Sequence, residues 1–182
     1  MKNYLPILIL ILSIGSINAQ SVNKLKKELL NSIEHKSDEL ITMSDNIWHA
    51  AEVAFREEKS AEYLIEYAKQ NGFDVDSDLA GMPTAFTATY GEGSPVIGII
   101  GEFDALPGLS QTNVPYKKEL TEGGAGHGCG HNLFGTASLG AAVAIKELIE
   151  KGSLKGTVKY YGTPAEEKFF GKLWMIREGV FD

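Results

Sequence analysis

The chain has 182 residues, a formal net charge of -7 and 43% hydrophobic residues, a composition typical of a globular protein of about one domain. No basic tract is present, so we expect no nucleic-acid partner. The only cysteine, Cys129, excludes an intramolecular disulfide, and an unpaired cysteine then needs another explanation.

The first residues, Met1–Ala19, have the pattern of a signal peptide. Lys2 precedes the apolar run Leu5–Ile14, and small residues supply a cleavage site before Gln20. The apolar run is shorter than the roughly 20 residues that cross a bilayer, so we expect no stable membrane anchor after cleavage. We therefore predict a periplasmic or secreted protein whose mature part covers residues 20–182.

The mature part alternates helical and strand patterns, which predicts an α/β fold. Pro95–Phe103 is almost continuously apolar, as in a strand buried on both faces of a sheet. The predicted helices are Ser21–Glu52 with a break near Ser37–Asp38, Lys59–Gln70, Leu133–Glu150 and Lys168–Glu178, and the predicted strands are Phe73–Val75, Thr84–Tyr90, Pro95–Phe103 and Thr157–Tyr161.

Acidic residues follow two of the predicted strands. Asp104 comes directly after Pro95–Phe103, and Glu166 and Glu167 follow Thr157–Tyr161. Open α/β sheets bind ligands at the carboxyl ends of their strands, so these carboxylates are candidates for a shared site.

Glu166 and Glu167 also allow a purely structural interpretation. Thr163 and Glu166 have the spacing of a capping box, with Pro164 at the first helical position. Carboxylates in a first helical turn also interact favourably with the helix dipole. Both interpretations remain open at this point.

A glycine-rich stretch, GHGCGHNLFG, holds His127, Cys129 and His131 at alternate positions. In extended backbone such residues point to one side, so their side chains can converge on one ion. We expect Asn132 to cap the helix that follows. The alternative is a glycine-rich loop without any ligand, in which the cysteine is a small buried hydrophobe.

Metal-assisted hydrolysis fits these residue types. A metal held by thiolate, imidazole and carboxylate lowers the pKa of bound water and polarises a carbonyl group. A neighbouring carboxylate then takes the proton from that water and gives it to the leaving amine. A Cys129–His131 nucleophilic dyad is the rival chemistry, but residues two apart rarely present a thiol and a base to one another.

Four motifs together resemble the aminoacylase/carboxypeptidase family of metallo-amidohydrolases. They lie in Gly101–Gln111, Gly126–Asn132, Pro164–Glu167 and Arg177–Asp182, and the resemblance covers Asp45–Asp182. It implies a zinc-exopeptidase-like catalytic domain, with a three-layer mixed sheet that has helices on both faces. It also implies a centre of two zinc or manganese ions that hydrolyses the amide of an N-acyl amino acid, such as an aroyl-glutamate, in a homo- or hetero-oligomer.

The resemblance also implies roles for individual residues. Cys129, His131 and Glu167 would be metal ligands, Glu166 the general base, and Asp104 the catalytic aspartate that orients a ligand. His127 has no ligand role in the related pattern. Glu102 stands where zinc exopeptidases carry a ligating histidine, and its role is left open.

Relatives continue beyond the position of Asp182 with a lid or dimerisation domain and two further histidine ligands. We therefore expect residues 20–182 to be the N-terminal portion of a catalytic domain, with an uncovered apolar sheet edge and little or no activity alone. The alternative function is a non-catalytic metal-binding or subunit-association module.

Overall fold

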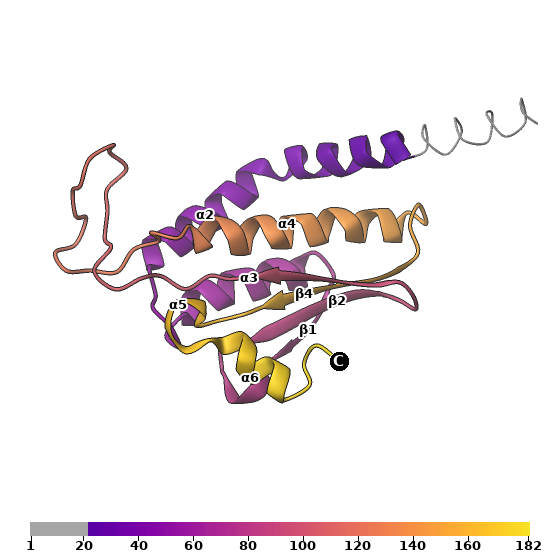
Figure 1. Cartoon of the computed structure of the whole chain (residues 1–182). Helices are drawn as coiled ribbons and strands as arrows, with labels where there is room; N and C mark the ends of the chain where they lie inside the picture. Colours follow the sequence, from indigo (N-terminus) through magenta and orange to yellow (C-terminus); the bar gives the residue numbers. More distant parts are fainter. Residues whose placement is uncertain (1–21) are drawn as a thin grey trace, which may run out of the picture.

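The computed structural model describes residues 22–182, so the expected signal peptide, Met1–Ala19, lies outside the described residues. The fold is mixed α/β, as predicted, with a four-stranded sheet and helices on its two faces (Figure 1). Within residues 22–182, no helix is both long and apolar enough to cross a membrane.

The elements follow the predicted order along the chain. Residues 22–35 are helical, and the break before the next helix falls at Lys36, beside the predicted break. The further helices are α2 (Ser37–Ala50), α3 (Glu58–Gln70), α4 (His131–Glu150), α5 (Glu166–Phe169) and α6 (Gly171–Arg177), with a short 3-10 helix η1 (Leu79–Gly81). The strands are β1 (Asp74–Ser77), β2 (Phe86–Glu92), β3 (Val96–Gly101) and β4 (Gly156–Gly162).

The strand order in the sheet is β1-β2-β4-β3. β2 runs antiparallel to both β1 and β4, whereas β3 runs parallel to β4 with Gly101 beside Gly162. Because the parallel strands end at the same edge of the sheet, the segments that follow β3 and β4 start side by side.

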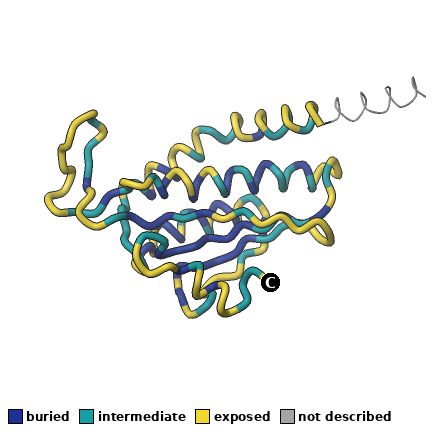
Figure 2. The backbone as a smooth tube through the Cα atoms, in the orientation of Figure 1, coloured by how far each residue is buried: buried dark blue, intermediate teal, exposed yellow. Residues whose placement is uncertain are grey.

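The main core lies between the sheet and the layer formed by α2, α3 and α4 (Figures 1 and 2). A smaller cluster on the opposite face includes Met82, Tyr161 and Met175, and α6 covers it. The largest wholly buried apolar side chains of the main core are Ile47, Leu64, Phe86, Phe103, Leu139, Val143, Val158 and Tyr160. The two faces are therefore covered to different extents.

The prediction that Pro95–Phe103 is buried on both faces is wrong. β3 is an edge strand, and Val96 and Ile97 are 60% and 50% exposed. An apolar run shows that a strand favours burial, but the covering must come from neighbouring elements. Among residues 22–182, β4 is the only strand that pairs with β3.

Two predicted helix caps are also absent. Asn132 lies inside the first turn of α4, and its Nδ2 donates to Ser44 Oγ at 3.0 Å. The residue that precedes α4 is Gly130, whose φ of 79° is the left-handed conformation that glycine adopts easily.

The capping box at Thr163 does not form either. The Thr163 hydroxyl is buried and donates to the Gly101 carbonyl oxygen at 3.2 Å, so it binds the end of β3 instead of a helix terminus. The helix begins after Ala165, and the predicted Lys168–Glu178 helix is divided into α5 and α6 at Phe170, which has a φ of 55°.

Candidate metal centre

Three segments meet at the carboxyl edge of β3 and β4. The segment after β3 carries Glu102 and Asp104, and the segment after β4 carries Glu166 and Glu167. The third is the glycine-rich loop that leads into α4. Gly126 in that loop allows a close backbone approach, since a Cβ there would lie 2.1 Å from the Leu109 carbonyl oxygen.

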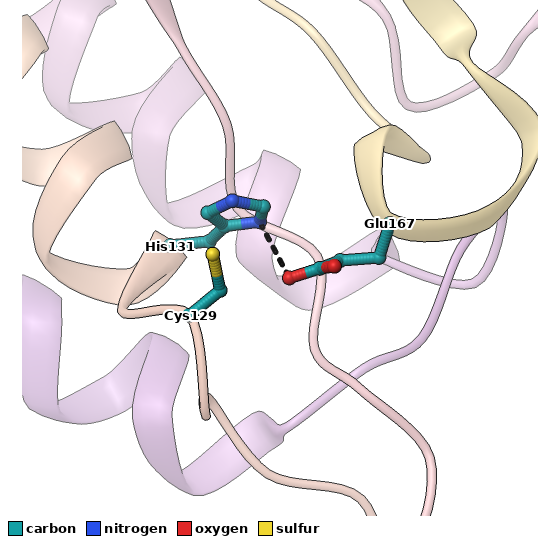
Figure 3. Close-up of side chains that lie close together, drawn as sticks. All are labelled: Cys129, His131 and Glu167. Atoms are coloured by element: carbon teal, nitrogen blue, oxygen red, sulfur yellow. Dashed lines mark ion pairs between the residues drawn. The ribbon is translucent and has the colours of Figure 1, made fainter.

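Cys129, His131 and Glu167 form the first group of potential ligands. One ligand atom of each lies within 4.8 Å of the others, and the side chains point toward one another (Figure 3). Glu167 Oε1 is buried and has no hydrogen-bond partner within the described part of the chain, residues 22–182, although it lies 3.9 Å from His131 Nδ1. A buried carboxylate oxygen without a donor is costly, and a cation at this point would satisfy it.

Asp104 fixes the orientation of the His131 ring. The carboxylate is buried, and its Oδ1 accepts a hydrogen bond from His131 Nδ1–H at 2.9 Å. The same carboxylate reaches the segment after β4, because Oδ2 accepts the Glu167 backbone N–H at 2.9 Å. Asp104 therefore connects His131 with Glu167.

The Asp104–His131 pair also shifts both pKa values. Burial opposes ionisation of Asp104, but the hydrogen bonds from His131 and from the Glu167 N–H outweigh it and lower the pKa of Asp104. Burial likewise opposes protonation of His131, but the hydrogen bond and charge of Asp104, with the charges of Glu102 and Glu167, raise the pKa of His131. In the metal-free protein the pair is thus stabilised in its charged form.

Glu102, His131 and Glu166 form a second group of potential ligands with mutual ligand-atom distances under 4.8 Å. His131 Nε2 lies 3.0 Å from Glu102 Oε2 and 3.8 Å from Glu166 Oε2. Because Nδ1–H is held by Asp104, Nε2 is the ring nitrogen that can bind a metal once it has lost its proton. His131 is common to both groups, and with Nδ1–H held by Asp104 it offers one nitrogen to one ion.

Sequence reasoning left the role of Glu102 open and missed Lys172. The Lys172 ammonium group on α6 donates a hydrogen bond to Glu102 Oε1. Lys172 follows the acidic pair in the chain without any spacing that relates it to Glu102, so only the fold could reveal this contact. Glu102 was detectable as a carboxylate directly after a strand.

His127 lies outside both groups, although it alternates with Cys129 and His131 in the sequence. Its Nε2 is 3.1 Å from the Ile47 carbonyl oxygen, so the ring is directed at the end of α2. The chain therefore turns between His127 and Cys129, and the alternating pattern does not place the three side chains together.

The nucleophilic dyad gains no support from the geometry. Both ring nitrogens of His131 face carboxylates, Asp104 and Glu102. Partial desolvation, together with the neighbouring Glu167, Glu166 and Glu102, raises the pKa of the Cys129 thiol. A nucleophilic cysteine requires the opposite shift, whereas a bound cation would stabilise the thiolate.

The donors around Glu167 Oε1 fit a divalent metal ion, because they include the Cys129 thiol and the His131 imidazole as well as carboxylates. The negative carboxylates would balance the positive charge of the ion. A mixed α/β sheet with such donors at the carboxyl ends of its strands is typical of metal-dependent hydrolases. Residues 98–182 match the family model described as Peptidase family M20/M25/M40. The chain contains a domain of this M20 peptidase family.

The sequences and structures that resemble this chain also belong to hydrolases and peptidases. The chain is 44% identical to a subunit of the p-aminobenzoyl-glutamate hydrolase of Escherichia coli, over 84% of this chain and 32% of that protein. It is 28% identical to a mouse Xaa-Arg dipeptidase, over 92% of this chain and 38% of that protein. It thus spans about a third of the length of these relatives.

A solved structure from Bacillus subtilis, described as a dinuclear metal-binding peptidase of the M20 family, aligns with a TM-score of 0.70 and 27% identity. The alignment covers 82% of this chain and 41% of that one. The likeness supports divalent metal binding in this family, and the chain is homologous to peptidases and amidohydrolases.

Proposed function

We propose that the protein is a metal-dependent amidohydrolase that cleaves the amide bond of an N-acyl amino acid, with p-aminobenzoyl-glutamate as the first substrate to test. The observation that carries the proposal is the convergence of Cys129, His131 and Glu167 around the partnerless Glu167 Oε1. The substrate class is suggested by the E. coli relative. Since the chain spans about a third of that relative, the activity is proposed for the whole protein.

Each residue has a separate role in the proposed reaction. Cys129, His131 and Glu167 would hold a divalent ion, and Asp104 holds His131 Nδ1–H, which leaves Nε2 facing Glu102 and Glu166. A divalent ion bound there lowers the pKa of water and polarises the scissile carbonyl.

Glu166 is the proposed general base. Its side chain is partly exposed, and Oε2 lies 3.8 Å from His131 Nε2, so the carboxylate borders both the centre and solvent. It accepts the proton of the attacking water and returns it to the leaving amine.

The donor set is compatible with zinc or manganese. A thiolate favours softer ions such as zinc, whereas carboxylates also accept manganese. A centre of two ions is suggested by the Bacillus subtilis structure, which is described as a dinuclear metal-binding peptidase. An oligomer is suggested by the E. coli relative, which is named as one subunit of a hydrolase, and export is suggested by the Met1–Ala19 sequence pattern.

The test is hydrolysis of p-aminobenzoyl-glutamate by the purified whole protein with added zinc or manganese, with metal binding measured in parallel. We expect turnover that a chelator removes and that Glu166→Gln reduces. Residues 20–182 alone should show little or no turnover. Metal binding without turnover would favour a non-catalytic metal-binding module. Failure of both zinc and manganese to bind would refute the proposed centre.

A further inference from the structure

Glu57 is a wholly buried carboxylate that belongs to neither ligand group. It lies just before α3, yet it contacts two distant parts of the chain. Oε1 accepts the Ala165 backbone N–H at 2.8 Å, and Oε2 accepts the Thr84 hydroxyl at 3.2 Å. Burying a carboxylate is unfavourable, so the fold places both of its oxygens against donors.

Ala165 has an unusual backbone conformation. Its φ of 57° and ψ of 38° are left-handed, which is unfavourable for alanine, and the residue is wholly buried. Glu166 and Glu167 follow directly, so this turn determines the direction in which their side chains leave the chain. Such strained residues persist only where the surrounding structure holds them.

The turn is held at two points. Glu57 binds the N–H of Ala165 where the turn begins, and Asp104 binds the N–H of Glu167 at 2.9 Å. Asp104 also contacts His131, whereas Glu57 contacts no proposed ligand. Of its two hydrogen bonds, the one to the Ala165 backbone leads toward the centre.

We propose that Glu57 is a positioning residue whose carboxylate holds Ala165 in the left-handed turn and so places Glu166 and Glu167 at the metal centre. The inference rests on the proposed function, because it concerns the same centre. A general role in stability would affect melting alone, whereas a positioning role changes metal affinity and the conformation of Ala165.

The first measurement is Co²⁺ binding by the purified chain, followed through the cobalt–thiolate absorption of Cys129. Glu57→Ala removes the acceptor, and we expect it to weaken Co²⁺ affinity about 10–100-fold, as losses of supporting hydrogen bonds do at metal sites. Glu57→Gln keeps an oxygen for Ala165 and can donate to the Thr84 hydroxyl, so it should retain an affinity within about twofold of wild type.

Glu52→Ala is the matched control. Glu52 accepts hydrogen bonds from the Ser60 N–H at 2.9 Å and the Ser60 hydroxyl at 2.8 Å, so its side chain supports the start of α3. We expect this variant to melt at a lower temperature and to keep Co²⁺ affinity within about twofold. A loss of affinity equal to that of Glu57→Ala would refute the positioning role.

The second measurement needs no metal. Backbone carbon chemical shifts of Ala165 report its conformation, and we expect the left-handed shifts in wild type, Glu57→Gln and Glu52→Ala but not in Glu57→Ala. If Glu57→Ala does not fold, Glu57→Asp replaces it, because the shorter side chain keeps the charge and withdraws the carboxylate from Ala165.

The outcomes separate the two proposals. If the wild-type chain does not bind Co²⁺, the metal centre is refuted, and the Ala165 shifts alone decide the role of Glu57. If Glu57→Ala or Glu57→Asp keeps both the wild-type shifts and the wild-type affinity, the inference is overturned.

Discussion

Replacing Asp104 with Asn tests how the centre is held together. The two oxygens of Asp104 accept the His131 Nδ1–H and the Glu167 N–H, each at 2.9 Å. An amide offers only one oxygen, so one buried donor would face an NH₂ group. An unsatisfied buried donor and the loss of a charge-assisted bond together cost about 2–4 kcal/mol. For a chain of this length we expect the melting temperature to fall by about 5–10 °C.

The pH dependence of this loss follows from the two pKa shifts. The lowered pKa of Asp104 stabilises the fold above its reference value of 3.8, and this contribution disappears as the pH falls through the folded pKa. The raised pKa of His131 stabilises the fold below its reference value of 6.5, and that contribution disappears as the pH rises through the folded pKa. The difference between wild type and Asp104→Asn should therefore be largest between pH 3.8 and 6.5.

The assay is thermal unfolding in the presence of a chelator, at about pH 5.5 and about pH 8.5. Asp76→Asn is the matched control, because Asp76 is exposed on β1 and the variant should melt like wild type. Equal melting temperatures for Asp104→Asn and wild type at the lower pH would show that the His131–Asp104 contact contributes nothing. An equal loss at both pH values would refute the assignment of the effect to the charged pair.

Three further predictions concern the same region. Glu166→Gln should lower the turnover of p-aminobenzoyl-glutamate by at least about 100-fold, and near-normal turnover would exclude Glu166 as the base. Metal affinity should rise about a hundredfold per pH unit below the raised pKa of His131, because the ion displaces one proton from His131 and one from the Cys129 thiol, and it should keep rising about tenfold per unit above it, where the thiol still holds its proton. Titrations at several pH values that give one affinity would contradict this. Gly126→Ala places a Cβ 2.1 Å from the Leu109 carbonyl oxygen and should cost about 1–3 kcal/mol in chemical unfolding, whereas wild-type stability would mean that the loop adjusts freely.

Local patterns in the sequence were sufficient to predict the order of the elements and the proximity of Asp104 and Glu167. Periodicity located α3 to within one residue and the end of α4 at Glu150, because a helix that packs on a sheet must repeat its apolar side. The meeting of Asp104 with Glu167 followed from their positions after two strands, which proved to be parallel neighbours.

Choices between competing partners could not be predicted locally. Thr163 has the spacing of a cap, but the Gly101 carbonyl oxygen at the end of the neighbouring strand accepts both its hydroxyl and its backbone N–H instead. The exposure of β3 depends on what lies beside it, and an apolar sequence contains no information about that. The left-handed conformation of Phe170, which divides the last helix, has no signal in the residue type, since such a φ is rare for bulky side chains.

The charged contacts of the candidate site also could not be predicted from the sequence. Glu102 meets both His131 and Lys172, and these residues come from the start of α4 and from α6. The distances from Glu102 to these two residues depend on how α4 and α6 pack against the sheet. Its residue type and its position after a strand identify Glu102 as a candidate site residue, but they do not predict which residues it contacts.

The unequal places of β3 and β4 in the sheet imply an unequal resistance to local opening. Among the strands of residues 22–182, β4 lies between two others and β3 has one neighbour, so amide protons of β3 should exchange with solvent faster than those of β4. Glu102 and Asp104 follow the labile strand, and Glu166 and Glu167 follow the protected one. The centre thus joins a part of the protein that opens at low free energy to a part that opens only with the core, and an arriving ion would slow exchange mainly on the β3 side.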